Sequence, residues 1–391
     1  MSLEALRAGR LAGATRVDLS AGLTTVPTEL FELADTLEIL DLSNNELTDL
    51  PADFTRLRRL KILFCSGNRF TRLPEVLGDL SELSLVGFRG NQIAEVPPAA
   101  LPAKLQWLIL TDNRLTQLPA ALGGCTRLQK CALAGNQLSW LPPAMAGCQQ
   151  LELLRLAANE FADLPLWLAE LPNLAWLAVG GNPLTHTREQ APHTVPSVPW
   201  SALQVGAEIG IGASGVVYRA LHQEAPLALK MFKGGLTSDG WASSELAAAG
   251  VVGEHPQIIG MTGVLIDHPQ AVSGLTMPLL AGGFRRLAGP PSFASCTRDV
   301  YAEDLRLTPG QSARIIEGLS AALAHLHARG VVHGDVYAHN IMWDGEGDAR
   351  LGDFGAASLL PPGAFREAAM VCDRRAFGHL VTELQQRTIK I

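Results

Sequence analysis

LEILDLSNNELTDLP (Leu37–Pro51), LKILFCSGNRFTRLP (from Leu60) and LSLVGFRGNQIAEVP (from Leu83) follow one another, and further copies begin at Leu105, Leu128, Leu151 and Leu174. The starts are spaced by 23, 23, 22, 23, 23 and 23 residues. An asparagine recurs in register in every copy, at Asn45, Asn68, Asn91, Asn113, Asn136, Asn159 and Asn182. This period predicts a stack of equivalent units, because one such unit cannot bury its own apolar face.

Each position of the repeat has a physical role. The alternating apolar residues predict a short strand with one face turned inward, and the asparagine can satisfy backbone groups where the chain turns. The Leu-Pro ending returns the chain across the convex side. The stretch ATRVDLSAGLTTVP, near residues 14–27, fits as a degenerate capping copy. The pattern resembles the leucine-rich-repeat family over roughly residues 14–185, which implies an α/β solenoid.

The strand positions that point away from the core form a largely apolar stripe on the concave surface. One column holds Ile39, Ile62, Leu85, Trp107, Lys130, Leu153 and Trp176, and the next column includes Phe64 and Ile109. An exposed apolar patch of this extent is typical of a protein-binding surface, with tryptophans as anchors. We therefore predict that Ile39, Ile62, Leu85, Trp107, Leu153 and Trp176 bind a protein partner or substrate. Burial of some of them under neighbouring parts of the chain is the alternative.

The composition limits the class of protein. The chain has 391 residues, of which 47% are hydrophobic, and a net charge of -7. This length allows two or three domains, and the acidity argues against nucleic acid or an anionic membrane as partner. The N-terminus lacks the apolar core of a signal peptide, and no apolar run reaches the ~18–20 residues of a membrane span. We expect a cytoplasmic protein whose six cysteines, which form no CxxC pair, are free thiols.

The repeat pattern stops after Asn182. The following THTREQAPHTVPSVPW contains Pro192, Pro196 and Pro199, which is typical of an extended, semi-rigid linker. We therefore predict a solenoid over residues 1–185, a linker over 186–200 and a second domain over 201–391.

A glycine-rich segment opens the second domain. The stretch IGIGASGVVY from Ile209 has the pattern G-x-G-x-x-G-x-V, whose glycines let backbone amides approach phosphates closely. Dinucleotide-binding folds share this pattern. Here a strand-like segment and Ala228-Leu229-Lys230 follow it, rather than a long crossover helix, which favours the strand–loop–strand of a kinase. Glu245, on the helical-looking WASSELAAAG, is the expected partner of Lys230, in preference to Glu254 beside the break at His255-Pro256.

The decisive stretch is HGDVYAHN (His333–Asn340), with Asp353-Phe354-Gly355 thirteen residues after the asparagine. Together with the glycine loop and Lys230, it resembles the H-R-D-x-x-x-x-N and D-F-G motifs of protein kinases. The resemblance implies a bilobal α+β domain that uses ATP with magnesium or manganese. Asp335 would accept the proton of the acceptor hydroxyl, and Asn340 and Asp353 would hold the metal.

The same resemblance implies further residues. Met277 would lie behind the adenine, Lys230 and Glu245 would hold the phosphates, and the ATP site would comprise Ile209, Gly210, Gly212, Gly215, Val217, Ala228, Lys230, Met277 and Leu280.

Local signals predict a helix that has Thr308 as its N-cap and Pro309 at its first position. Its apolar face would carry Ile315, Leu319, Leu323 and Leu326, which recur at helical spacing. Asp373 would start the large C-lobe helix and support the backbone of the catalytic loop.

The sequence departs from the kinase pattern at several positions. Gly334 replaces the motif's arginine, and Tyr337 replaces the usual lysine. Asp373 follows Asp353 by 20 residues, no A-P-E appears, and the chain stops at Ile391 after one expected helix. We expect a reduced peptide-docking platform and, with Ser358 as the single hydroxyl residue between these aspartates, activity that does not depend on phosphorylation of this segment.

The expected architecture is a leucine-rich-repeat α/β solenoid followed by a protein-kinase-like domain. The expected function is that of a serine/threonine-type protein kinase whose repeats recruit a protein partner or substrate. Two alternatives remain open. One is an ATP-binding pseudokinase scaffold, favoured by Tyr337. The other is a small-molecule kinase of the aminoglycoside or choline kinase type, since such enzymes share the H-G-D variant.

Overall fold

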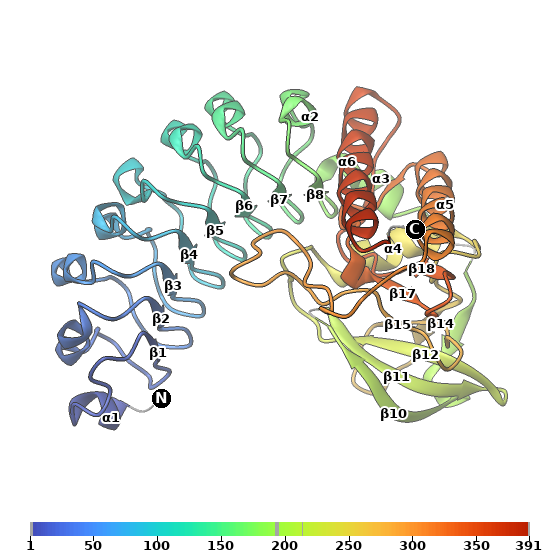
Figure 1. The fold of residues 1–391 in the computed structure, drawn as a ribbon, viewed down its shortest axis with the longest axis horizontal. Coiled ribbons are helices and arrows are strands. Elements are labelled where there is room, and N and C mark those ends of the chain that lie inside the picture. Colours follow the sequence, from blue (N-terminus) through green and yellow to red (C-terminus); the bar gives the residue numbers. More distant parts are fainter. Residues whose placement is uncertain (1–2, 192–194, 213, 390–391) are drawn as a thin grey trace. The chain divides into compact units, whose positions relative to one another are not determined.

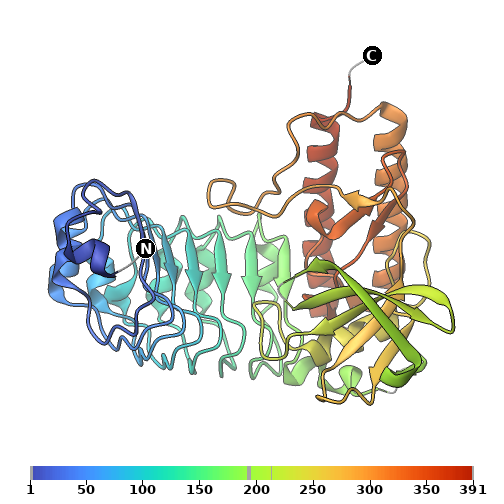
Figure 2. The same ribbon diagram turned by 90° about the horizontal axis from the view of Figure 1, so that it is seen from below.

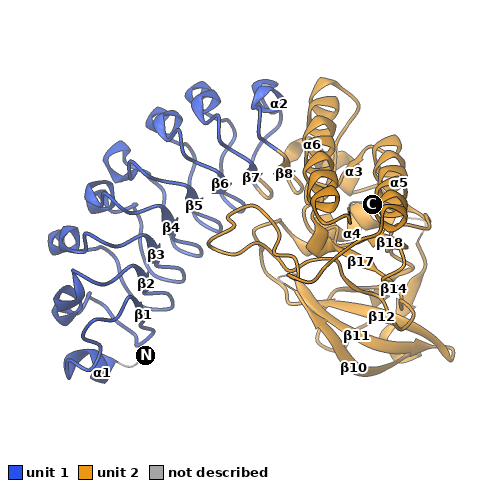
Figure 3. Ribbon diagram, viewed as in Figure 1, with its two compact units in different colours: residues 1–155, 159–174 blue, residues 156–158, 175–391 orange. Residues whose placement is uncertain are grey.

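The computed structural model describes residues 3–191, 195–212 and 214–389. The chain forms two compact units, one of residues 1–155 and 159–174 and one of residues 156–158 and 175–391 (Figure 3). The strand of the last repeat therefore groups with the C-terminal half of the chain. The sequence-based boundary at residue 185 does not anticipate this grouping.

Short strands that pair in parallel, in chain order, form the sheet of the first unit (Figure 1). They are β1 (Arg16–Asp18), β2 (Ile39–Asp41), β3 (Ile62–Phe64), β4 (Leu85–Gly87), β5 (Trp107–Ile109), β6 (Lys130–Ala132) and β7 (Leu153–Arg155). Equivalent repeat positions are aligned, as with Ile39 opposite Ile62. Arg16 pairs with Ile39 in the same way, so residues 14–27 do form the first repeat of the stack.

In the first unit, the segments that connect one repeat strand to the next contain short 3-10 helices. Most of these helices begin directly after the proline of the repeat. They are η1 (Thr28–Leu33), η2 (Ala52–Arg56), η3 (Glu75–Asp79), η4 (Pro98–Ala100), η5 (Ala120–Gly124) and η6 (Pro143–Gly147), with α1 (Leu3–Arg7) before and α2 (Trp167–Glu170) after them. These prolines are the N-cap residues, with an extended backbone, and proline is tolerated there because the N–H that it lacks has no partner within the helix.

The recurrent asparagines form a ladder of hydrogen bonds. In one rung, Asn68 Nδ2 donates to the carbonyl oxygens of Leu42 (2.9 Å) and Cys65 (3.1 Å), while its Oδ1 accepts from the Leu47 N–H (2.9 Å). These asparagines are buried throughout the stack. The predicted role is confirmed: each side chain satisfies backbone groups that the turn would otherwise leave unpaired and buried.

The second unit begins with the last repeat strand, β8 (Trp176–Ala178), and α3 (Pro183–Glu189). Asn182 is the N-cap of α3, with Pro183 at its first position. Farther along, β9 (Ser197–Pro199) pairs in parallel with β13 (Gly263–Ile266). The predicted linker over 186–200 is therefore partly wrong, since its first residues complete a helix and its last ones join a sheet. Pro192 lies outside the described residues.

An antiparallel sheet with one parallel edge forms the first lobe of this unit (Figure 2), in the order β10-β11-β12-β14-β13-β9. Its strands are β10 (Leu203–Ile211), β11 (Gly215–His222), β12 (Ala225–Phe232), β13 (Gly263–Ile266) and β14 (Gly274–Pro278), and α4 (Ala242–Val252) follows β12 in the chain. A core of Ala220, Leu229 and Leu265 lies beneath the sheet, with Trp200 and Val205 packed against it.

The second lobe is mainly helical, and its helices α5 (Pro309–Ala328) and α6 (Ala364–Gln386) lie side by side (Figures 1 and 2). The chain between α5 and α6 forms η8 (Ala338–Asn340) and the short strands β16 (Val331–Val332), β17 (Ile341–Trp343), β18 (Ala349–Leu351) and β19 (Ser358–Leu359). The strand β15 (Arg285–Arg286) precedes α5, and the helix η7 (Trp200–Ala202) precedes β10 in the first lobe. None of the described helices combines the length and hydropathy that a bilayer span requires.

The predicted start of α5 is confirmed, and that of α6 is wrong. Thr308 accepts a hydrogen bond from the Gln311 N–H and caps α5, with Pro309 at its first position. The last helix begins at Ala364, nine residues before Asp373, directly after Gly363. The segment between Asp353 and this helix is therefore even shorter than the sequence motif indicates.

Candidate active site

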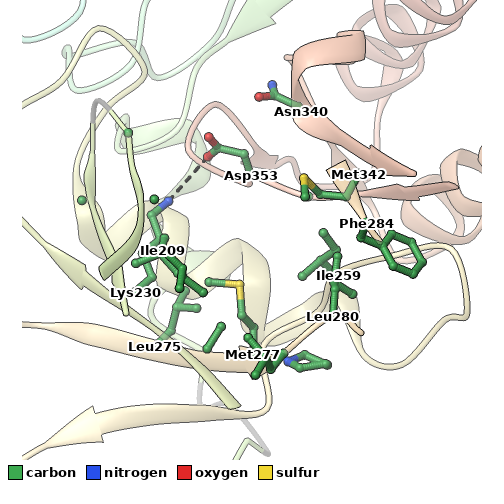
Figure 4. Close-up of a pocket in the computed structure, with 18 of the residues that line it drawn as sticks. Ile209, Lys230, Ile259, Leu275, Met277, Leu280, Phe284, Asn340, Met342 and Asp353 are labelled. Atoms are coloured by element: carbon green, nitrogen blue, oxygen red, sulfur yellow. Dashed lines mark ion pairs between the residues drawn. The ribbon is translucent and has the colours of Figure 1, made fainter. Parts of the chain in front are cut away.

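A cavity of about 660 Å³ lies between the glycine loop, the strands β12 and β14, and the segments around residues 340 and 353 (Figure 4). Every residue that the sequence assigned to ATP lines it, namely Ile209, Gly210, Gly212, Gly215, Val217, Ala228, Lys230, Met277 and Leu280. The glycine loop joins β10 to β11, with the Gly212 N–H bonded to the Gly215 carbonyl oxygen at 2.9 Å. A Cβ on Gly215 would lie 2.5 Å from the carbonyl oxygen of Met231, so this glycine is required by close packing.

Lys230 and Glu245 form a buried ion pair, and the two residues are 7% and 3% exposed. Lys230 reaches the pair from β12 and Glu245 from the first turn of α4. Burial opposes the charge on Lys230, but the carboxylates of Asp353 and Glu245 outweigh it and raise the pKa of the ammonium group. Glu254 is exposed and lies beyond the end of α4, so the structure brings together the preferred pair.

Asp353 faces this pair across the cavity. Its Oδ1 lies 3.5 Å from the Lys230 Nζ (Figure 4). The backbone of Asp353 has φ +58°, in the left-handed region that few residues other than glycine adopt. The next side chain, Phe354, is buried, and its ring centroid lies 5.2 Å from that of His333. The buried Phe354 thus holds the turn that aims Asp353 at Lys230.

Asp335 and Asn340 are joined directly. The Asn340 Nδ2 donates to the Asp335 Oδ2 at 2.7 Å and to the Asp335 carbonyl oxygen at 2.9 Å. With its Nδ2 engaged in this way, Asn340 lines the cavity with an amide oxygen left to serve as a ligand. The loop therefore fixes the orientation of both predicted side chains.

Asp373 supports the backbone of the catalytic loop from α6, as the sequence predicted. It is fully buried, and its carboxylate accepts from the N–H groups of His333 (2.7 Å) and Gly334 (2.8 Å). The His327 Nε2 lies 3.0 Å from the same carboxylate. Three polar partners from two segments thus converge on one side chain and tie the loop to both helices.

His339 is a cavity residue that the sequence analysis missed. The buried Asp299 accepts from its backbone N–H (3.1 Å) and lies 2.7 Å from its Nδ1. Burial alone would lower the pKa of His339, but Asp299 and Asp335 raise it. Ile259, Phe284 and Met342 line the same cavity. His339 stands at a variable position of HGDVYAHN, so the motif gives it no role. Ile259, Phe284 and Met342 belong to no motif, because they come from irregular or very short segments whose proximity depends on the tertiary fold.

Asn340 and Asp353 are the cavity residues that were predicted to hold a divalent cation. Within the described ranges, no cluster of three or more His, Cys, Asp or Glu side chains forms a metal site. Asn340 and Asp353 both line the cavity and would supply two oxygen ligands, leaving the rest to water and phosphate. This donor set fits magnesium, which proteins hold through one or two carboxylates together with substrate phosphates.

The predicted partner-binding stripe is only partly present at the surface. Ile39, Ile62 and Trp107 are half-buried, and the Lys130 Nζ lies 4.2 Å from the Trp107 ring centroid. Leu85 and Leu153 are buried. The prediction for Trp176 is wrong: it is 2% exposed, because its ring stacks on that of Tyr337.

Comparison with known proteins identifies the same two regions of the chain, the repeats and the kinase-like domain. The protein kinase domain family matches residues 203–375, and the leucine rich repeat family matches residues 16–70. The leucine-rich repeat receptor-like protein kinase PXC2 of Arabidopsis thaliana is 29% identical over 194 residues, covering 48% of this chain and 18% of its own length. Serine/threonine-protein kinase PkaB of Streptomyces coelicolor is 29% identical over 160 residues, covering 39% of this chain and 36% of its own length.

A solved leucine-rich-repeat protein of Leptospira interrogans is 27% identical, with a TM-score of 0.30, covering 43% of this chain and 55% of that protein. The matches to curated relatives span about a third or less of the first two relatives' own lengths. Repeats, catalytic motifs and family matches coincide along the chain. The protein therefore consists of a leucine-rich-repeat region followed by a protein kinase domain.

Proposed function

We propose that the chain is an ATP-dependent protein kinase of the serine/threonine type, with repeats that recruit a protein partner or substrate. The observation that carries the proposal is the assembled cavity. Lys230 is paired with Glu245 and lies 3.5 Å from Asp353. Three charged groups from β12, α4 and the D-F-G turn meet where a nucleotide triphosphate would lie, which is the arrangement that phosphoryl transfer requires.

Each residue has a role in this proposal. Lys230, held by Glu245, binds the α- and β-phosphates, and the glycine loop covers them. Asn340 and Asp353 would hold magnesium or manganese, which when bound offsets the negative charge of the phosphates. Asp335 accepts the proton of the attacking hydroxyl, and its bond from Asn340 fixes the direction of the carboxylate.

The acceptor class is tested by labelling. The full chain is incubated with magnesium and ATP labelled on the γ-phosphate, together with a protein acceptor, an aminoglycoside or choline. We expect label on serine or threonine of the protein acceptor, established by acid hydrolysis and separation of phosphoamino acids. Label on the aminoglycoside or choline would support the small-molecule alternative. Nucleotide binding without transfer to any acceptor would support the pseudokinase scaffold, which Tyr337 in place of lysine favours.

Regulation through the repeats, rather than through the segment after Asp353, is part of the proposal. Ser358, the hydroxyl residue of that segment, is 1% exposed, and its Oγ accepts from the Val179 N–H at 3.1 Å. Gly334 supplies no charge to bind a phosphate group nearby. These observations support activity that is independent of Ser358 phosphorylation.

Recruitment is expected to depend on Trp107, the tryptophan of the stripe that is not fully buried. Trp107→Ala should raise the KM for the acceptor protein by about thirtyfold, corresponding to about 2 kcal/mol, while kcat stays unchanged. The matched control is Trp140→Ala, because Trp140 is exposed and lies outside the strands of the stripe. An unchanged KM in Trp107→Ala, measured by steady-state kinetics on a folded protein, would assign Trp107 to packing instead.

A further inference from the structure

The last repeat strand makes direct contact with the catalytic loop within the second unit. The rings of Trp176 and Tyr337 are stacked, with centroids 4.2 Å apart and planes inclined by 6°. The Trp176 Nε1 also donates to the carbonyl oxygen of Val336 at 3.2 Å. Both rings are almost fully buried, at 2% and 5% exposure. Trp176 therefore fixes the two residues that directly follow Asp335 in the chain.

The residue directly before Asp335 touches the same strand. Gly334 has φ +71°, and a Cβ there would lie 2.6 Å from the Leu177 carbonyl oxygen and 2.7 Å from that of Ala356. No side chain fits in this space, so the arginine of the kinase motif could not stand here while the strand keeps its position. Asp335 is thus flanked on both sides by residues in contact with β8.

Further bonds tie the last repeat to the strands that enter and leave the loop. Val179 donates to Ser358 on β19, and β19 pairs with β16 immediately before the catalytic loop. Arg188 of α3 donates to the carbonyl oxygens of Gly330 (2.9 Å) and Leu360 (2.7 Å). The last repeat and the helix α3 that follows it therefore contact the segments on either side of the loop as well as residues 334–337 within it.

We propose that the last leucine-rich repeat is a positioning element of the kinase domain and that Trp176 is a positioning residue for Asp335. The two departures from the kinase motif, Gly334 and Tyr337, are then adaptations to this contact: glycine admits the strand, and tyrosine stacks on the tryptophan. The catalytic part of the inference rests on the proposed function. The contact itself is independent of it.

Kinetics of the full chain test the catalytic part. Trp176→Ala should lower kcat about a hundredfold, because a displacement of about 1 Å at a reacting group has this effect. The KM for ATP should change less than about threefold, since Lys230, Glu245 and Met277 belong to other elements. Trp176→Phe keeps a ring beside Tyr337 but loses the Nε1 bond to Val336 and part of the indole's contact with His379 and Arg298, so it should recover kcat to within about tenfold of the wild type.

Hydrogen exchange of backbone amides tests the contact without relying on activity. In Trp176→Ala, amides of residues 334–337 should exchange at least about tenfold faster, while those of α5 keep their wild-type rates. Trp140→Ala, which removes an exposed tryptophan from the repeats, should leave both kinetics and exchange unchanged. If Trp176→Ala does not fold, Trp176→Phe is used to test whether Trp176 positions the loop. The expected result is a loss of about threefold to tenfold in kcat and faster exchange that is confined to residues 334–337.

The contrary outcomes distinguish failure of the positioning role of the last repeat from failure of the proposed kinase function. Wild-type kcat and wild-type loop exchange in a folded Trp176→Ala protein would overturn the inference. So would accelerated exchange throughout the unit with kcat and ATP affinity falling together, because that pattern indicates general destabilisation. If the wild type transfers no phosphate, the proposed function fails, and the exchange of residues 334–337 still decides whether the repeat positions the loop.

Discussion

Replacing Lys230 with methionine is expected to lower kcat/KM by about a thousandfold. The ammonium group is held in the cavity by Glu245 and lies beside Asp353, and removing one such charge from a phosphate-binding site costs about 10²–10³ in rate. Methionine keeps most of the volume of the side chain, so the cavity should retain its shape. The measurement is steady-state phosphotransfer with magnesium and ATP.

The loss of stability in Lys230→Met should be small and confined to the second unit. Glu245 would be left without its partner, but burial already raises the pKa of this carboxyl group, so proton uptake can remove the unpaired charge. Thermal unfolding of Lys230→Met with Glu245→Gln should therefore resemble that of the wild type, although the double variant remains inactive.

A surface control accompanies these variants. Lys104→Met breaks an exposed pair with Glu82 and should leave both turnover and unfolding unchanged, since such pairs contribute little. Wild-type turnover in a folded Lys230→Met protein would contradict the role given to Lys230. Simultaneous unfolding of the repeats of the first unit would contradict the expectation that the loss of stability is confined to the second unit.

The features that the sequence predicts well are those that depend on local or periodic signals. The nearly constant period of the repeat predicts the strands, the prolines and the asparagine ladder together. Thr308 and Pro309 predict the start of α5 because capping is decided within one turn. The part of the cavity lining that comes from the glycine loop, Lys230, Asn340 and Asp353 could be predicted because these residues belong to motifs with fixed spacing.

The features that were missed depend on contacts between distant segments. Trp176 occupies the same column as Ile39 and Trp107, and a strand position that points outward has the same pattern whether it is exposed or covered. Tyr337, which packs on Trp176 and buries it, lies far along the chain, and no local signal in the sequence connects the two residues. The helix α3 was open to prediction, because Asn182 and Pro183 repeat the cap-then-proline signal of Thr308 and Pro309.

The early start of α6 shows a different limitation. Resemblance to the kinase motif predicts that the helix starts at Asp373, although Pro361, Pro362 and Gly363 directly precede a run of good helix formers. Proline and glycine end the preceding segment, and the residues from Ala364 onward have high helix propensity. Local propensity was thus a better guide than resemblance at this point, because the family pattern is shortened here.

Turnover of ATP by the full chain with magnesium, compared with that of Asp335→Asn, tests the central claim most directly. Asparagine has nearly the same shape and can keep contact with Asn340, but it cannot take up a proton from the acceptor. We predict phosphate transfer by the wild type, a loss of kcat of about 10³-fold in Asp335→Asn, and ATP binding within about threefold of the wild type. Equal rates in the two proteins, or no magnesium-dependent transfer by the wild type to any acceptor, would contradict the assignment of this domain as an active kinase.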